Sequence, residues 1–295
     1  KKNNSELASL LRSLGIDVLI DINGYLGKGR IEIFNSRVCR LQISWLGYNN
    51  TIGLNHSDYL IADKNLILEK EKALYKEKII YLDEIWNSHA GLNIQRKFNP
   101  LPSQNSGAFT LGSFNNYLKI SDDTIIVWSE ILRKIKNSKL ILKSSVSYSE
   151  VHFIDLFERE GVLNKVIFKN KLNSFEQHIN LYKDIDLCLD TFPYSGVTTT
   201  CEALWMNVPV VSMEGFNFNS RCGESILINS NLKDLVAKNK DDYISKVLSF
   251  ANDLDKLEKT RKFIFDEVLK TNTFNTKKFA GNFWKSILDT YTNHK

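Results

Sequence analysis

Short apolar runs alternate with amphipathic stretches along the whole chain. At the start, leucines recur at the spacing of one helix face, which predicts a helix over 4–14. They are Leu7, Leu10, Leu11 and Leu14. Apolar, β-rich runs then predict strands at 16–21, 41–45, 58–62 and 78–82. The first part of the chain is therefore expected to consist of strands joined by helices and loops.

The alternation becomes more regular after residue 106. Apolar runs predict strands at 109–114, 140–143, 166–168, 186–190 and 209–213. Helices are expected between these strands, and they carry end signals: Ser121 and Ser174 are placed to cap helix starts, and Gly161 to end a helix. A helix over 199–206 and further helices through to Asn293 complete the pattern.

The segment 83–106 breaks this rhythm, because polar residues, Pro100 and Pro102 gather in it, as in a linker. We place the domain boundary near 105, which gives an N-terminal domain with linker over 1–105 and a C-terminal domain over 106–295. Strands separated by helices predict parallel sheets covered on both faces, and two such units joined by a linker predict a bilobed protein of the α/β fold class. Ligands of such sheets bind beyond the carboxyl ends of the strands.

Composition and charge exclude several classes of protein. The chain is 43% hydrophobic and 25% charged, which is typical of a folded protein. Its net charge of +5 is spread among acidic neighbours instead of forming a basic stripe, so no nucleic-acid partner is expected. The cysteines and histidines form no CxxC, HxH or HxxxH pair, so no metal site is expected. No apolar run approaches the length of a membrane span. The four cysteines lie far apart and give no disulfide framework, so we expect a protein of the reducing cytoplasm.

The segment 186–205 carries the clearest chemistry. A strand ends at Asp190, a loop with Gly196 follows, and Thr198 and Thr199 stand where the next helix begins. Free N–H groups at a helix start bind phosphate, and Glu202, one turn later, could accept hydrogen bonds from the hydroxyls of a ribose. The alternative is purely structural: Thr198 caps the helix, Glu202 balances its dipole and Gly196 makes a turn.

A second cluster, 111–120, directly follows the first strand of the second domain. Lys119 stands there just before a helix, where its ammonium group could stabilise a departing diphosphate. The alternative is a solvated surface lysine. In the first domain, a glycine-rich turn over 23–30 matches neither a dinucleotide fingerprint nor a P-loop. Tyr25, Trp45 and Tyr48 could line a sugar pocket or pack in the core.

Several runs of the chain, in order, resemble one family. They are 21–25, 42–48, 58–63, 114–120, 186–196, 201–211 and 220–221. They look like the catalytic region of the O-linked N-acetylglucosamine transferase and SPINDLY family, especially its bacterial members, and the match spans nearly the whole chain. The resemblance implies a GT-B glycosyltransferase, in which two Rossmann-type domains face a cleft that holds the donor. As in GT-B folds generally, the last helix, about 276–293, is expected to cross back and brace the first domain. Its apolar face would consist of Phe279, Phe283, Trp284 and Leu288.

The resemblance also implies roles for individual residues. Lys119 would stabilise the leaving diphosphate, while Thr198 and Thr199, in the loop of Gly196, would bind phosphate. Because a lysine and a helix N-terminus hold the pyrophosphate in such enzymes, neither a metal nor another cofactor is expected, and the UDP-sugar is a co-substrate. The implied reaction moves N-acetylglucosamine from UDP-GlcNAc to Ser or Thr hydroxyls of a protein acceptor, with inversion.

The remaining implied contacts concern the nucleoside and the sugar. Glu202 would bind the ribose, His178 and Asn116 would help to hold the nucleotide, and Gly47 would face the donor sugar. For His178 the alternative is an exposed helix histidine.

The chain departs from the family pattern at several positions. Val197 stands where animal members have a histidine, Phe175 where a lysine is frequent, and Asn116 where a glutamine is common. Asn49 and Asn50 replace a Pro-Gly pair. The alternatives are therefore GDP-fucose or UDP-glucose as donor, or a non-catalytic nucleotide-sugar-binding fragment. The family's first domain begins further upstream and usually follows tetratricopeptide repeats, so the first domain is expected to be incomplete.

Overall fold

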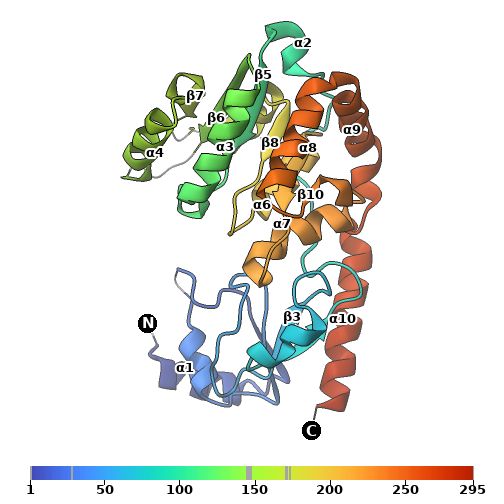
Figure 1. The fold of residues 1–295 in the computed structure, drawn as a ribbon. Coiled ribbons are helices and arrows are strands. Elements are labelled where there is room, and N and C mark those ends of the chain that lie inside the picture. The colour runs from blue at the N-terminus through green and yellow to red at the C-terminus, as the bar shows by residue number, and fades with distance from the viewer. Residues whose placement is uncertain (1, 28, 144–147, 170–171, 173, 295) are drawn as a thin grey trace. The chain divides into compact units, whose positions relative to one another are not determined.

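The computed structural model describes residues 2–27, 29–143, 148–169, 172 and 174–294 (Figure 1). The chain forms two compact units. Unit 1 comprises Lys1–Ser88 and Thr276–Lys295, and unit 2 comprises His89–Asn275. The chain therefore passes between the units twice, and the first unit is built from both ends of the sequence. Within the described residues, no helix combines the length and hydrophobicity of a membrane span.

Unit 1 is a parallel sheet with helices on its faces. Its strands follow the order β1-β2-β3-β4, and they are β1 (Val18–Asp21), β2 (Leu41–Ser44), β3 (Tyr59–Ala62) and β4 (Lys78–Tyr81). The helical elements are α1 (Asn4–Ser13), η1 (Ile31–Asn35), η2 (Glu69–Leu74) and α10 (Thr276–Asn293). All four expected strands and the first helix are present. The glycine-rich turn 23–30 is described except for Lys28, which lies outside the described residues.

Polar residues of the family-like runs hold this sheet together. The Asp58 carboxylate accepts two hydrogen bonds from the Arg37 guanidinium and one from the backbone N–H of Gln42. The Gln42 side chain is buried and in turn accepts from the backbone N–H of Val38 at 2.7 Å. Asp63, fully buried, accepts from the N–H of Trp86 at 3.0 Å. These side chains therefore have structural roles.

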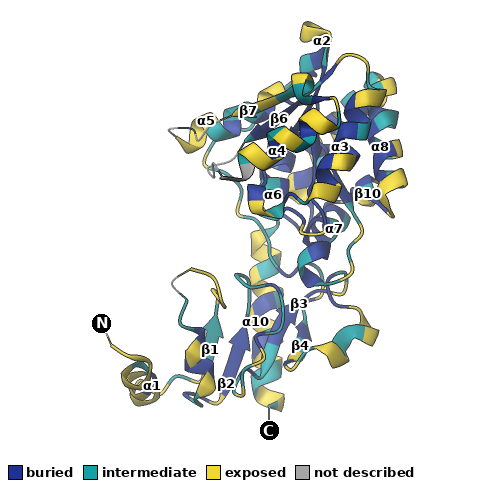
Figure 2. Cartoon of the chain, turned by 60° about the vertical axis from the view of Figure 1, so that its left-hand side comes forward, coloured by how far each residue is buried: buried dark blue, intermediate teal, exposed yellow. Residues whose placement is uncertain are grey.

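Helix α10 packs against the sheet of unit 1 (Figure 2). Phe283 is 4.6 Å from the Trp45 ring, centroid to centroid, and Phe279 stacks on Trp45 at 6.1 Å. The prediction that this helix braces the first domain is confirmed, and Trp45 is a core residue. The expected apolar face was only half right, because Trp284 and Leu288 are 59% and 62% exposed.

Unit 2 contains a six-stranded parallel sheet in the order β10-β9-β8-β5-β6-β7. Its strands are β5 (Phe109–Ser113), β6 (Ser138–Lys143), β7 (Val166–Lys169), β8 (Leu187–Leu189), β9 (Val210–Met213) and β10 (Val236–Ala237). Its α-helices are α2 (Pro102–Ser106), α3 (Asp122–Lys134), α4 (Tyr148–Arg159), α5 (Phe175–Asn180), α6 (Thr198–Trp205), α7 (Phe218–Asn229), α8 (Lys240–Asn252) and α9 (Leu254–Glu267). Single turns of 3-10 helix are η3 (Tyr117–Lys119), η4 (Leu163–Lys165), η5 (Leu181–Asp184), η6 (Lys233–Leu235) and η7 (Val268–Lys270). The short strand β10 was not expected.

The predicted helix-capping residues are confirmed. The Ser121 and Ser174 hydroxyls accept hydrogen bonds from the N–H groups of Thr124 and Gln177, at the starts of α3 and α5. Gly161, just past the end of α4, has a left-handed φ of 71°.

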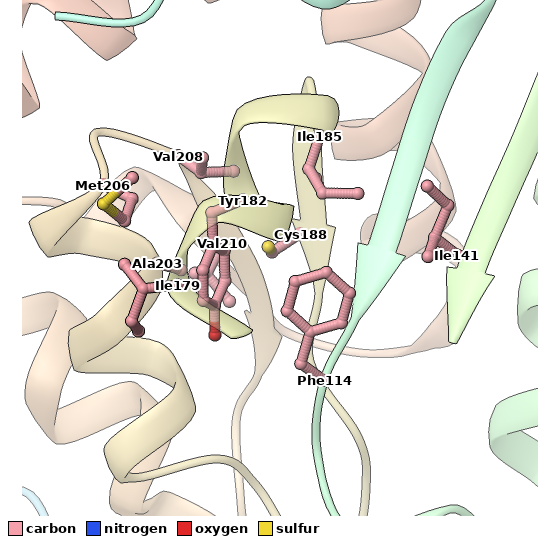
Figure 3. Packing of buried hydrophobic residues seen from close by; sticks show 10 residues of the cluster. All are labelled: Phe114, Ile141, Ile179, Tyr182, Ile185, Cys188, Ala203, Met206, Val208 and Val210. Atoms are coloured by element: carbon pink, nitrogen blue, oxygen red, sulfur yellow. The ribbon is translucent and has the colours of Figure 1, made fainter. Parts of the chain in front are cut away.

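One face of the sheet is packed against α5, η5 and α6 by a buried apolar cluster (Figure 3). Phe114 directly follows β5, and its ring is 4.7 Å from that of Tyr182, centroid to centroid. Val208 and Met206 extend the cluster beyond the C-terminal end of α6. The cluster therefore fixes α6 against the strands that carry the candidate site.

The segment expected to be a linker, within 83–106, is largely part of unit 2. Arg96 donates to the carbonyl oxygens of Leu204 and Trp205 at the end of α6, and to those of Ile264 and Phe265 near the end of α9. Ser103 donates to the buried Asp186 carboxylate at 2.8 Å. The division between the units thus lies at Ser88 and His89, earlier than the boundary expected near 105, and α10 belongs with the first unit.

Candidate functional site

The candidate site lies where β5 and β8 meet in the middle of the unit 2 sheet. The chain order runs outward from these two strands in opposite directions, through β6 and β7 on one side and through β9 and β10 on the other. In open parallel sheets this reversal leaves a crevice beyond the carboxyl ends of the two central strands, where ligands bind. The loops after β5 and β8 carry most of the residues expected to bind a nucleotide sugar.

Asp190 organises the loop that follows β8. Its side chain is buried, and Oδ1 accepts hydrogen bonds from the N–H groups of Gly196 at 2.7 Å and Thr191 at 2.8 Å, and from Asn115 at 3.1 Å. Oδ2 accepts from the Ser212 hydroxyl at 2.6 Å. Burial raises the pKa of Asp190, against the opposing effect of these donors. The carboxylate therefore folds the loop back onto the strand end and presents the start of α6.

Helix α6 begins without a side-chain cap. Its N-cap residue is Val197, which makes no capping hydrogen bond, so the alternative that Thr198 caps the helix is wrong. The first backbone bond of the helix joins the Cys201 N–H to the Val197 carbonyl, after the N–H groups of Thr198, Thr199 and Thr200. An uncapped helix start presents such N–H groups to an anion.

Thr199 and Gly196 hold the start of α6 beside the end of β5. The Thr199 hydroxyl donates to the Asn115 side-chain oxygen at 2.6 Å. A Cβ atom on Gly196 would stand 2.7 Å from the Thr200 hydroxyl and 2.8 Å from that of Thr199. Only glycine fits there without displacing the threonines, so Gly196 shapes the site while its N–H is used by Asp190.

Lys119 points into the same loop from η3. Its Nζ donates to the Ser195 carbonyl at 2.9 Å and lies 4.1 Å from the centre of the Tyr194 ring. Burial lowers the pKa of Lys119, while the negative charge of Asp190 acts in the opposite direction. The alternative of a solvated surface lysine is therefore wrong.

Glu202 and His178 form a buried polar pair beside this loop. His178 Nε2 is 2.9 Å from Glu202 Oε2, and their side chains are only 12% and 6% exposed, so His178 is not an exposed helix histidine. The Tyr182 hydroxyl donates to the same oxygen at 3.2 Å. Phe114 and Phe175 lie beside the His178 ring, with centroids at 5.9 and 6.1 Å. A carboxylate, an imidazole and two aromatic rings therefore come together here, with Phe114 buried in the core and Phe175 exposed.

Two predicted site residues, Asn116 and Gly47, contribute no side chain to the described hydrogen bonds around Asp190 and the Lys119 ammonium group. The Asn116 side chain is exposed and accepts a hydrogen bond from the N–H of Leu118 in its own turn. Gly47 lies after β2 in unit 1, where a Cβ atom would be 2.4 Å from the Ile22 carbonyl oxygen. Gly47 thus permits two loops to approach closely, and its role toward a donor sugar stays a prediction.

Sequence reasoning missed several residues of the site. Asn115 occupies the network in which Asn116 was expected, and Asp190, Tyr182 and Tyr194 were given no role. Lys143, at the end of β6, was also missed; burial lowers its pKa, and the charge of Glu202 opposes this. The available signal was position, because Lys143 ends β6 and Asp190 directly follows β8 at the carboxyl edge of the sheet. Among the described residues, no three His, Cys, Asp or Glu side chains cluster as metal ligands.

Comparison with known proteins identifies the family. The model of glycosyl transferase family 41 matches residues 2–90 and 88–283. The chain belongs to glycosyltransferase family 41. The Arabidopsis thaliana protein named probable UDP-N-acetylglucosamine–peptide N-acetylglucosaminyltransferase SPINDLY is 32% identical over 294 residues, which are 96% of this chain and 32% of that protein. The chain thus spans about a third of the length of the curated relatives it matches.

Solved structures place this family 41 chain among the GT-B glycosyltransferases. A mutant O-GlcNAc transferase from Thermobaculum terrenum superposes with a TM-score of 0.87 at 27% identity, covering 98% of this chain and 56% of that one. Sucrose-phosphate synthase from Thermosynechococcus elongatus, 11% identical, shares the fold with a TM-score of 0.64. The expected fold class, two Rossmann-type α/β domains of the GT-B kind, is confirmed.

Proposed function

We propose that this chain provides the catalytic region of a glycosyltransferase that moves N-acetylglucosamine from UDP-GlcNAc to Ser or Thr hydroxyls of proteins. The observation that carries the proposal is the uncapped start of α6, where Thr199 is hydrogen-bonded to Asn115 just after β5. The loop that leads into this helix start also holds the Lys119 ammonium group, through the Ser195 carbonyl. A helix start and a fixed cation in one place are suited to a diphosphate. The names of the SPINDLY relatives supply the donor and the peptide acceptor.

In the proposed reaction the acceptor oxygen attacks the anomeric carbon of the sugar. The bond between that carbon and the β-phosphate oxygen breaks, the acceptor proton passes to a general base, and the anomeric configuration inverts. Negative charge grows on the departing UDP. Lys119 and the N–H groups of Thr198 and Thr199 would stabilise that charge, and the proposed mechanism uses no metal ion or other cofactor.

The nucleoside is proposed to lie on the aromatic side of the site. Glu202 would accept hydrogen bonds from the ribose hydroxyls, and His178 would contact the base, with Phe114 and Phe175 beside it. Asn116, exposed at the start of η3, would also help to hold the nucleotide. Because the four cysteines are buried thiols that no disulfide joins, we also propose a reducing compartment such as the cytoplasm. They are Cys39, Cys188, Cys201 and Cys222.

Nucleotide release from a sugar donor tests this function. With UDP-GlcNAc, the chain should release UDP in the presence of acceptor polypeptide, and mass spectrometry should find the added sugar on Ser or Thr. Lys119→Ala should lower the rate by a factor on the order of 10², because it removes a fixed charge that faces the leaving group. The matched control is Lys259→Ala, an exposed lysine of α9.

The donor is tested in the same assay. GDP release from GDP-fucose, or a preference for UDP-glucose, would replace the proposed sugar but keep the transferase. An unchanged rate in Lys119→Ala would remove the proposed role of that lysine.

A further inference from the structure

Tyr194 is the one aromatic side chain described in contact with the Lys119 ammonium group. The centre of its ring lies 4.1 Å from Nζ, well within the range of a cation–π interaction. The neighbouring Ser195 supplies the carbonyl oxygen that accepts a hydrogen bond from Nζ at 2.9 Å. Two successive residues of one loop therefore contact the cation, one through a ring face and one through its backbone.

The loop that carries Tyr194 is fixed on several sides. The Tyr194 carbonyl accepts a hydrogen bond from the Thr191 hydroxyl at 2.6 Å. The Ser195 hydroxyl accepts from the N–H of Gly223 at 2.9 Å and donates to the Asn219 carbonyl at 3.2 Å. A short antiparallel bridge between Ile120 and Pro193 joins the residues next to Lys119 and Tyr194. The ring is thus held beside the lysine by its backbone.

A lysine needs such support because its side chain is long and flexible. Four methylene groups separate the ammonium from the backbone, and holding them in one arrangement costs conformational entropy. An ammonium group donates several hydrogen bonds, so contacts with one carbonyl and one ring leave donor capacity for a ligand oxygen. A cation already in place stabilises developing charge without reorganisation.

We propose that Tyr194 is a positioning residue that holds the Lys119 ammonium group for the diphosphate of the nucleotide sugar. This inference rests on the proposed function. It predicts that the ring face is the part that matters, so phenylalanine substitutes for tyrosine and an aliphatic side chain does not. It also predicts that the effect of Tyr194 on diphosphate binding passes through Lys119.

The test compares UDP with UMP, which lacks the terminal phosphate of the leaving group, by calorimetric titration. Tyr194→Leu should weaken UDP binding by about tenfold, within the range of a partly desolvated cation–π contact, and change UMP binding by less than about twofold. Tyr194→Phe should retain UDP affinity. Phe263→Leu on α9, an aromatic residue of similar exposure at 38% against 40%, is the matched control.

A double-mutant cycle shows whether the effect passes through the lysine. In a Lys119→Ala background, Tyr194→Leu should cause no further loss of UDP affinity. Equal losses for UDP and UMP, or a full additional loss in that background, would overturn the proposal, since either would mean that Tyr194 shapes the loop in general.

A third measurement separates this inference from the proposed function. The Tyr194 ring should shift the NMR signals of the Lys119 ε-methylene group by its ring current, in wild type and Tyr194→Phe but not in Tyr194→Leu. If the wild-type chain binds UDP and Tyr194→Leu binds it with the same affinity, the inference about Tyr194 is overturned and the proposed function is not. A wild-type chain that does not bind UDP overturns the proposed function, and the inference with it, whatever the ring current shows.

Discussion

The ammonium group of Lys119 lies between a carbonyl oxygen and an aromatic ring, in surroundings that lower its pKa. A diphosphate is bound by the charged form of the lysine. Because the pKa is lowered, the charge is lost at a lower pH than for a free lysine, whose pKa is about 10.4. UDP affinity should therefore depend on pH in a range where an ordinary lysine stays charged.

The expected result is a Kd for UDP that rises with pH in the range below the ordinary lysine pKa of about 10.4, where a free lysine stays charged. Lys119→Arg is the control, since a guanidinium remains charged throughout this range and should give a flat profile. Titration calorimetry at a series of pH values measures both. A flat profile for the wild-type chain would contradict the assigned surroundings of Lys119.

Single residues of the site were only partly predictable from the sequence. Lys119, Thr199 and Glu202 could be located because they stand just after strands or in the first turns of a helix, where ligand groups gather. Asn115 could not be distinguished from Asn116, because the direction of each side chain depends on how the loop turns after Ser113. Asp190 was read as a strand end, and its bonds to Gly196 and Ser212 become visible only in the folded loop.

At the level of elements, α10 contributes to stability through the side that is buried against the sheet of unit 1. Phe283 is buried against Trp45, whereas the adjacent Trp284 is 59% exposed. Truncating a buried aromatic side chain removes its transfer free energy and leaves a cavity, while truncating an exposed one does neither.

We expect Phe283→Ala to lower the free energy of unfolding of unit 1 by about 3–5 kcal/mol. Trp284→Ala, the matched control one residue away, should change it by less than about 0.5 kcal/mol. Denaturant titration, followed by the fluorescence of the tryptophans that remain, measures both variants. Similar losses in the two would mean that α10 is not packed against the sheet by its Phe279 and Phe283 side.

The same contrast explains which elements the sequence predicted well. Helix starts at Ser121 and Ser174 depend on hydrogen bonds to residues three positions away, so local sequence is sufficient. Which side of α10 is buried depends on tertiary packing, because its apolar residues lie on two adjacent sides of the helix. The segment around Arg96 resembled a linker because its attachment comes from carbonyl groups distant in sequence.

For the whole molecule, the pattern of strands and helices predicted two parallel α/β sheets but not how the chain divides between them. The C-terminal helix was expected to brace the first domain, yet the predicted domain bounds of 106–295 included it in the second. The sequence alone groups a helix with the segments next to it in the chain. Contacts assign it to unit 1, together with the first part of the chain. The match to the family 41 model extends over both units, as do the sequence runs that resemble the family.

In the proposed function, the crevice beyond β5 and β8 in unit 2 binds the nucleoside diphosphate of a sugar donor. Calorimetric titration of the chain with UDP, and separately with GDP, tests it most directly. We expect saturable UDP binding that exceeds GDP binding, is weakened in Gly196→Ala and Lys119→Ala, and is unchanged in Lys259→Ala. Absence of binding to either nucleotide, or UDP binding that both site variants leave intact, would contradict it.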